Sequence, residues 1–130
     1  MKLTCLIVDD EPLARRLVEN FAHRCKNVKV IESFDNLQDA FGFLEKIKYE
    51  VDVVFLDVQI GKETSILLLA KNGIDKEVRI VFTSAYPSTI YGDFDIRYFE
   101  WLQKPIPFET FEEVVEKIRI EKYLNRNSNS

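Results

Sequence analysis

The chain has 130 residues, of which 46% are hydrophobic and 31% charged, a balance typical of one folded globular domain rather than a disordered segment. Its net charge of -4 argues against direct binding of nucleic acid by this domain. Its apolar stretches are shorter than the roughly 20 residues of a transmembrane helix, and its N-terminus does not resemble a secretion signal. We therefore expect a cytoplasmic protein that does not span a membrane.

The first strand and helix of the chain follow from its hydrophobic pattern. Leu3–Val8 is a continuous apolar run, which indicates a strand buried on both faces. Pro12 suits the first turn of a helix. Leu13, Leu17 and Phe21 recur at a spacing of four, which predicts that they form the packing face of this helix.

The next elements repeat this alternation. A weaker strand is expected over Val28–Ser33, and the helix after it has two candidate caps, Asp35 and Asn36. Val51–Leu56 predicts a third buried strand, which runs directly into Asp57.

The second half of the chain continues in the same way. Thr64–Asn72 predicts a helix closed by Gly73, and Val78–Phe82 a fourth strand. The segment Pro87–Phe94 gives the weakest helical indication, because it contains a proline, a glycine and few strong helix formers. Arg97–Leu102 is expected to be a fifth strand, at the edge of the sheet.

The last helix is expected to bury Phe108, Phe111 and Ile118, and the domain to end at residue 122. Residues 123–130 are polar and are expected to form a disordered tail. Strands that alternate with helices predict an α/β fold, a doubly wound five-stranded parallel sheet with helices on both faces.

Polar residues follow four of the predicted strands. They are Asp9 and Asp10, Asp57, Ser84 and Lys104. In such sheets the ligand site lies beyond the carboxyl ends of the strands. We therefore expect these five side chains to form one site.

The three aspartates suit a hard cation with oxygen ligands, above all Mg²⁺. An alternative is that Asp9 or Asp10 only caps the helix that starts at Pro12. Lys104 precedes a proline, which favours an extended backbone at that position.

A metal, a lysine and a hydroxyl around one carboxylate match the requirements of phosphoryl transfer to that carboxylate. In this interpretation Asp57 attacks phosphorus, while Mg²⁺ and Lys104 neutralise the phosphoryl oxygens, and Ser84 supplies the hydroxyl.

The chain resembles the receiver domains of two-component response regulators over about residues 3–120. The matching motifs are Val8-Asp9-Asp10-Glu11-Pro12, Leu56-Asp57, Thr83-Ser84-Ala85-Tyr86 and Lys104-Pro105. The stretch 82–86, with Phe94 and the ending Leu102–Ile106, is most similar to receivers of LytTR-type transcriptional regulators. The resemblance implies the flavodoxin-like strand order 2-1-3-4-5.

The resemblance also implies roles for individual residues. Asp57 would be the phosphoacceptor and a ligand of Mg²⁺. Asp10 would bind Mg²⁺ directly, Asp9 through water, and Gln59 through its backbone carbonyl. Lys104 would assist the reaction at Asp57.

Two further residues would form the switch that responds to phosphorylation. Ser84 would move toward the phosphoryl group, and Trp101 occupies the aromatic switch position. The alternative for Trp101 is a strand aromatic that only packs on the neighbouring helix. No separate organic cofactor is implied.

The implied partner is a sensor histidine kinase that donates the phosphoryl group. The chain would be either a stand-alone receiver or, as its similarity to LytTR-type regulators favours, the N-terminal part of a regulator whose DNA-binding output domain lies outside this sequence. The face around residues 87–118 would form a homodimer or output contact. Catalysis would be limited to self-phosphorylation from phosphodonors and autodephosphorylation.

The chain departs from the family pattern after the acceptor aspartate. Gly61 stands where such receivers carry a proline, and Ser65 where they carry a glycine. A more mobile or differently shaped loop is therefore expected. One alternative function is a receiver-like interaction module that works without phosphorylation. Another is a phosphatase with an aspartyl-phosphate intermediate, although Gln59 stands where that chemistry usually places a second aspartate.

Overall fold

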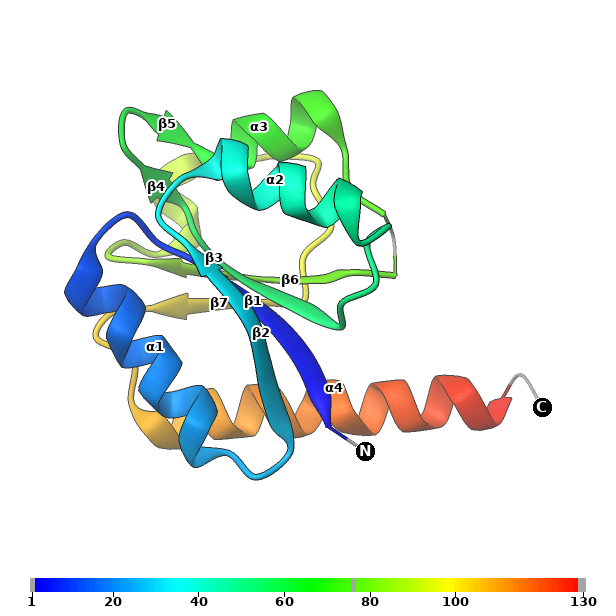
Figure 1. Cartoon of the computed structure of the whole chain (residues 1–130). Helices are drawn as coiled ribbons and strands as arrows, with labels where there is room; N and C mark the ends of the chain where they lie inside the picture. Colours follow the sequence, from blue (N-terminus) through cyan, green and yellow to red (C-terminus); the bar gives the residue numbers. More distant parts are fainter. Residues whose placement is uncertain (1, 76, 129–130) are drawn as a thin grey trace.

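A five-stranded parallel sheet crosses the middle of the computed structural model, which describes residues 2–75 and 77–128 (Figure 1). The strands lie in the order β2-β1-β3-β6-β7. Their bounds are β1 (Leu3–Val8), β2 (Val28–Phe34), β3 (Val53–Asp57), β6 (Arg79–Ser84) and β7 (Glu100–Gln103). Since β6 and β7 are the fourth and fifth strands of this sheet, the predicted α/β fold and the order 2-1-3-4-5 are confirmed.

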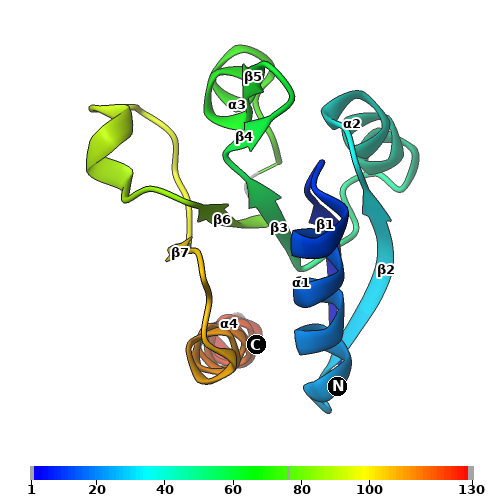
Figure 2. The same cartoon turned by 90° about the vertical axis from the view of Figure 1, so that its left-hand side faces the viewer.

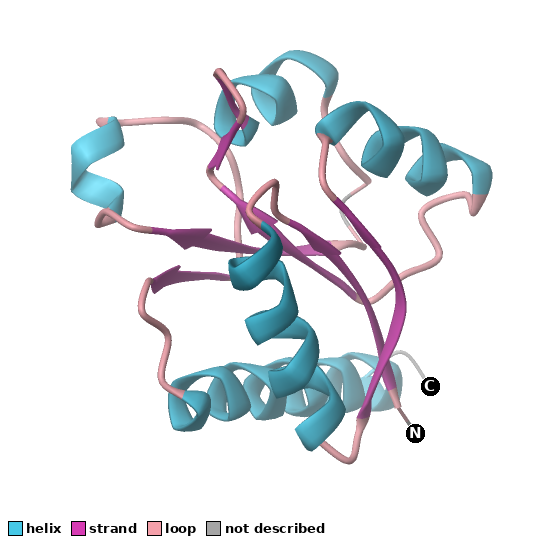
Figure 3. Ribbon diagram, turned by 60° about the vertical axis from the view of Figure 1, so that its left-hand side comes forward, coloured by secondary structure: helices cyan, strands magenta, loops and turns pink. Residues whose placement is uncertain are grey.

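Helices cover both faces of the sheet (Figures 2 and 3). One face carries α1 (Pro12–Arg24) and α4 (Phe108–Ser128), and the other carries α2 (Leu37–Lys46) and α3 (Ser65–Asn72). Alternate residues of β1 point to opposite faces. Leu3, Cys5 and Ile7 join the cluster under α1 and α4, whereas Leu6 and Val8 join the cluster under α2 and α3.

Two helix starts and one helix end follow the sequence closely. Asn36, rather than Asp35, caps α2, because its side chain accepts a hydrogen bond from the Asp39 N–H at 2.8 Å. Thr64 caps α3 in the same way, so that this helix begins at Ser65. Gly73, with φ +72°, closes α3 as predicted.

The packing face of α1 differs from the prediction. The side chains of Val18, Phe21 and Ala22 are buried, whereas Leu13 is 73% exposed and Leu17 41% exposed. A helix has 3.6 residues per turn, so each step of four residues advances by about 40° around the axis. Over two such steps Leu13 rotates away from the face that Phe21 occupies.

The segment between β6 and β7 contains no α-helix within the described residues. It forms a single turn of 3-10 helix, η1 (Ser88–Tyr91), followed by an irregular stretch. Aromatic rings fill this side of the sheet instead: Phe82, Tyr91, Phe94, Tyr98 and Trp101, with centroids of contacting rings 5.5 to 6.4 Å apart. Because the irregular stretch occupies the chain up to residue 98, β7 begins later than the predicted Arg97.

The last helix is longer than expected. The predicted buried residues Phe111 and Ile118 lie in the core and Phe108 is partly buried, but α4 continues through Ser128, where a disordered tail from residue 123 was expected. Two ion pairs hold its later turns to the sheet, Arg79–Glu121 at 2.8 Å and Lys122–Asp52 at 2.7 Å. Residues 129 and 130 lie outside the described part of the chain.

The loop after Asp57 has a defined shape. It forms an antiparallel hairpin of β4 (Gln59–Ile60) and β5 (Glu63–Thr64). Gly61 has φ +62° at the first position of the two-residue turn, where a type II′ hairpin turn requires glycine. The loop is therefore an ordered hairpin, which agrees with the expected difference in shape.

Candidate functional site

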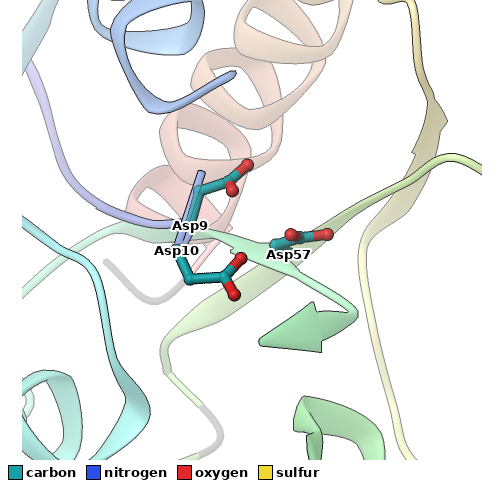
Figure 4. A group of neighbouring side chains, drawn as sticks. All are labelled: Asp9, Asp10 and Asp57. Carbon is teal, nitrogen blue, oxygen red and sulfur yellow. The ribbon is translucent and has the colours of Figure 1, made fainter. Parts of the chain in front are cut away.

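Three aspartates meet at the carboxyl edge of the sheet (Figure 4). Asp9 and Asp10 directly follow β1, and Asp57 is the last residue of β3. One carboxylate oxygen from each lies within 4.8 Å of the others. Asp9 and Asp57 are buried and Asp10 is exposed, so the cluster opens to solvent on the Asp10 side.

Lys104 reaches this cluster from the end of β7. Its Nζ lies 3.0 Å from Asp9 Oδ2 and 3.5 Å from Asp57 Oδ1. Its backbone N–H donates to the Ser84 carbonyl at 2.6 Å, and the peptide bond to Pro105 is cis. The structure thus brings together four of the five predicted site residues by direct side-chain proximity.

The charges in the site are unbalanced, because one lysine faces three carboxylates. Burial, and next the negative charge of Asp9, raise the pKa of Asp57 from 3.8 to about 7. Burial acts to lower the pKa of Lys104, but the charges of Asp57 and Asp9 outweigh it and raise that pKa. A site with excess negative charge and only oxygen donors from its carboxylates fits a hard divalent cation such as Mg²⁺.

The capping alternative explains little of this arrangement. Asp9 Oδ1 does accept the Glu11 N–H at 2.9 Å, near the start of α1, but its other oxygen is bonded to Lys104. Asp10 is not a cap: its Oδ2 accepts the Gly61 N–H at 2.8 Å, across 51 positions in sequence. The N-cap position itself is Glu11, which forms no side-chain cap bond.

Ser84 lies at the end of β6, buried, but its hydroxyl is engaged with an aromatic segment. Ser84 Oγ accepts the Tyr86 N–H at 3.0 Å and lies 3.3 Å from the Tyr91 hydroxyl. Trp101 Nε1 donates to the Tyr86 carbonyl at 3.0 Å, and its ring packs on Tyr91 and Phe82. No sequence pattern indicated Tyr91 as a partner of Ser84, since the contact depends on the η1 turn.

Gln59 begins the hairpin, and Ser65 directly follows it. Gln59, whose carbonyl was the further predicted ligand, donates from Nε2 to the Gly61 carbonyl at 3.3 Å. Ser65 is fully buried and its hydroxyl donates to the Asp57 carbonyl at 2.8 Å. The sequence singled out Ser65 as a departure from a family pattern but gave no indication of this bond.

Comparison with known proteins identifies this arrangement. The family described as the response regulator receiver domain matches residues 5–116. The chain belongs to this family. The predicted receiver identity is thereby confirmed, and the buried aspartate cluster fits the phosphoacceptor site of such domains.

The relatives of this receiver domain are response regulators of the LytR kind. It is 32% identical over 116 residues to the sensory transduction protein LytR of Staphylococcus haemolyticus, covering 88% of the receiver and 44% of that protein. It is 28% identical over 117 residues to the transcriptional regulatory protein BtsR of Escherichia coli K12, covering 90% and 48%. The chain spans about half the length of the relatives it matches.

Solved structures show the same fold. The response regulatory domain of protein mrkE from Klebsiella pneumoniae superposes with a TM-score of 0.77 at 24% identity, covering 92% of this chain and 97% of that one. A response regulator from Thermotoga maritima gives 0.70 at 25% identity, covering 91% and 98%. Among the described residues, no helix combines the length and apolarity needed to cross a bilayer.

Proposed function

We propose that Asp57 accepts a phosphoryl group from a sensor histidine kinase in a Mg²⁺-dependent reaction, and that this modification switches the face around residues 87–118. The observation that carries the proposal is the geometry at Asp57. Its buried carboxylate belongs to a cluster of carboxylate oxygens within 4.8 Å of one another, with Lys104 Nζ 3.5 Å away.

The residues present divide the chemical task. Asp57 is the nucleophile, and it must be ionised to attack phosphorus. Lys104 favours that ionised form, and its ammonium group can neutralise charge on the phosphoryl oxygens. We assign Asp10, Asp57 and the Gln59 carbonyl as direct ligands of Mg²⁺ and Asp9 as a ligand through water. When bound, the ion supplies positive charge that stabilises the transferred group.

The switch would pass through Ser84. A phosphoryl group adds negative charge and acceptor oxygens beside Asp57 and so attracts the Ser84 hydroxyl. Ser84 Oγ now contacts Tyr86 and Tyr91, so its movement would loosen the segment that also holds Trp101. This movement would couple Asp57 to the face around residues 87–118.

The partners follow from the family and its relatives. We propose that this domain is cytoplasmic, that its partner is a sensor histidine kinase, that the face around residues 87–118 forms a homodimer or output contact, and that the domain precedes a DNA-binding output domain. The support is that similar proteins about twice as long include one named as a transcriptional regulatory protein.

Phosphorylation can be tested directly. The protein is incubated with Mg²⁺ and a small phosphodonor such as acetyl phosphate, and its intact mass is measured. The wild type should gain one phosphoryl group, Asp57→Asn none, and the exposed control Asp95→Asn as much as the wild type.

Two results would contradict the proposal. They are a wild type that gains no phosphoryl group, and a gain that survives Asp57→Asn. A folded protein that stays unmodified while a face around residues 87–118 still dimerises would favour the phosphorylation-independent interaction module instead.

A further inference from the structure

We propose that the β4–β5 hairpin is part of the metal site, because the backbone N–H of Gly61 positions the Asp10 carboxylate for Mg²⁺. This inference rests on the proposed binding of Mg²⁺ by Asp10. It adds a positioning residue that is not itself a ligand and that departs from the family pattern.

The contact is direct and joins distant parts of the chain. Gly61 N donates to Asp10 Oδ2 at 2.8 Å, across 51 positions in sequence. Asp9 and Asp57 both lie beside Lys104, whereas Asp10 is held by the hairpin. The bond coexists with the close arrangement of the three carboxylates, so it is compatible with the geometry that a cation requires.

The bond has a clear physical role. Asp10 is exposed and lies beside two other carboxylates, so repulsion favours turning its side chain out into solvent. An N–H donor to an ionised carboxylate gives a charge-assisted hydrogen bond, which offsets this repulsion. Groups that orient metal ligands in this way commonly change metal affinity by about 10-fold or more.

Glycine at position 61 makes this bond available. Gly61 has φ +62° in a two-residue turn, a conformation that β-hairpins reach with glycine at this position. The proline found there in similar receivers has φ fixed near about -65° and has no N–H. The departure from the family pattern therefore supplies a donor that a proline lacks.

The second departure anchors the base of the same hairpin. The Ser65 N–H donates to the Val58 carbonyl at 2.8 Å, and the Ser65 hydroxyl donates to the Asp57 carbonyl at 2.8 Å. A glycine at position 65 could make the first bond but not the second. The hairpin is thus tied to the acceptor strand at its base and to Asp10 at its tip.

Removing only the Gly61 N–H gives the sharpest test. The amide at Gly61 is replaced by a backbone ester in the full chain, and Mg²⁺ affinity is measured by isothermal titration calorimetry. The matched control is the same ester at Gly92, which has φ +72° and whose N–H makes a long bond of 3.4 Å to the Thr89 carbonyl. We expect about 10-fold weaker Mg²⁺ binding for the Gly61 ester and a change below about 2-fold for the control.

Side-chain variants give a second, recombinant test. Gly61→Ala keeps the N–H, and nothing lies within 4 Å of the added Cβ, although φ is strained. Gly92→Ala introduces the same kind of strain outside the hairpin. Gly61→Ala should retain Mg²⁺ affinity within about 3-fold, whereas Gly61→Pro should lose about 10-fold or more, with folding checked by circular dichroism.

The outcomes separate the two proposals. If the wild type binds Mg²⁺ and the Gly61 ester binds it equally or more tightly, the inference is overturned while the proposed function stands. Equal losses in Gly61→Ala and Gly61→Pro would also overturn it, since strain rather than the donor would then be the cause. A wild type that binds no Mg²⁺ overturns the metal site and the inference together.

Discussion

Asp57 is buried beside Asp9, and burial followed by that like charge raises its pKa from 3.8 to about 7. In the metal-free protein the carboxyl group is therefore partly protonated near neutral pH, while an efficient nucleophile must be ionised. Lys104 opposes the shift but does not cancel it. A divalent cation in the cluster would restore the ionised form, which gives Mg²⁺ a role before any phosphoryl group arrives.

Asp57→Asn should stabilise the metal-free protein at alkaline pH. A raised folded-state pKa contributes stability that is fully present below the unfolded value of 3.8 and is lost as pH rises through about 7. The shift, which already includes the attraction of Lys104, corresponds to about 4 kcal/mol between charge states, and screening by solvent on the exposed Asp10 side reduces the effect on stability. We expect Asp57→Asn to raise the free energy of unfolding by about 2 kcal/mol at about pH 8 and to leave it almost unchanged at about pH 4.

Urea unfolding with a metal chelator at both pH values measures this difference. If Asp57→Asn destabilises the protein equally at the two pH values, the buried charge of Asp57 does not lower the stability of the wild type at alkaline pH.

At the scale of elements, α4 and β1 are joined to the turn before β3 through Asp52. Asp52 Oδ1 lies 2.7 Å from Lys122 Nζ, and its Oδ2 accepts the Thr4 N–H at 2.8 Å. Burial acts to raise the pKa of Asp52, but the bonds from Lys122 and Thr4 outweigh it and lower that pKa. These bonds hold the later turns of α4 against the sheet.

Asp52→Asn should destabilise the protein at neutral pH but not in acid. A lowered folded-state pKa gives stability that is present above the unfolded value of 3.8 and is lost as pH falls through the folded one. We expect the free energy of unfolding to fall by about 1 kcal/mol at neutral pH. The effect is no larger because Lys122 is partly exposed, so that solvent weakens its ion pair with Asp52.

Chemical denaturation at neutral and acid pH tests this, with the exposed Glu77→Gln as control. A loss that is independent of pH would mean that packing, rather than the charge of Asp52, holds α4.

At the scale of the whole molecule, two cores lie on opposite faces of the sheet, and Phe111 is central to one of them. It is fully buried, with its ring centroid 4.9 Å from that of Phe55 on β3 and 5.6 Å from that of Phe21 on α1. The ring therefore joins sheet and both helices on that face.

Phe111→Ala should cost about 3–5 kcal/mol of unfolding free energy, because it removes the ring and leaves a cavity. Thermal and urea unfolding measure the loss, and Leu124→Ala, at a position 58% exposed, should change little. A loss in Phe111→Ala as small as that of Leu124→Ala would show that the core under α1 and α4 is loosely packed.

Much of the site could be predicted from local patterns. Buried apolar runs that end in Asp9, Asp57 and Ser84 define strand ends, and in a parallel sheet such ends share one edge. The aspartates and Lys104 meet there. Local patterns failed for α1. A spacing of four residues predicted that Leu13 lies on the packing face, but successive steps of four residues rotate around the helix axis, so Leu13 lies away from that face and is exposed.

By itself, the sequence determined the alternation of strands and helices, the carboxyl-edge position of the acid cluster and the resemblance to receivers. Only the tertiary structure decided that Gly61 binds Asp10, that Ser84 contacts Tyr91, and that α4 continues past residue 122. The physical reason is that hydrophobic periodicity depends only on residues close together in the sequence. These contacts depend instead on a turn with positive φ, a single 3-10 turn and an ion pair between residues far apart in the chain.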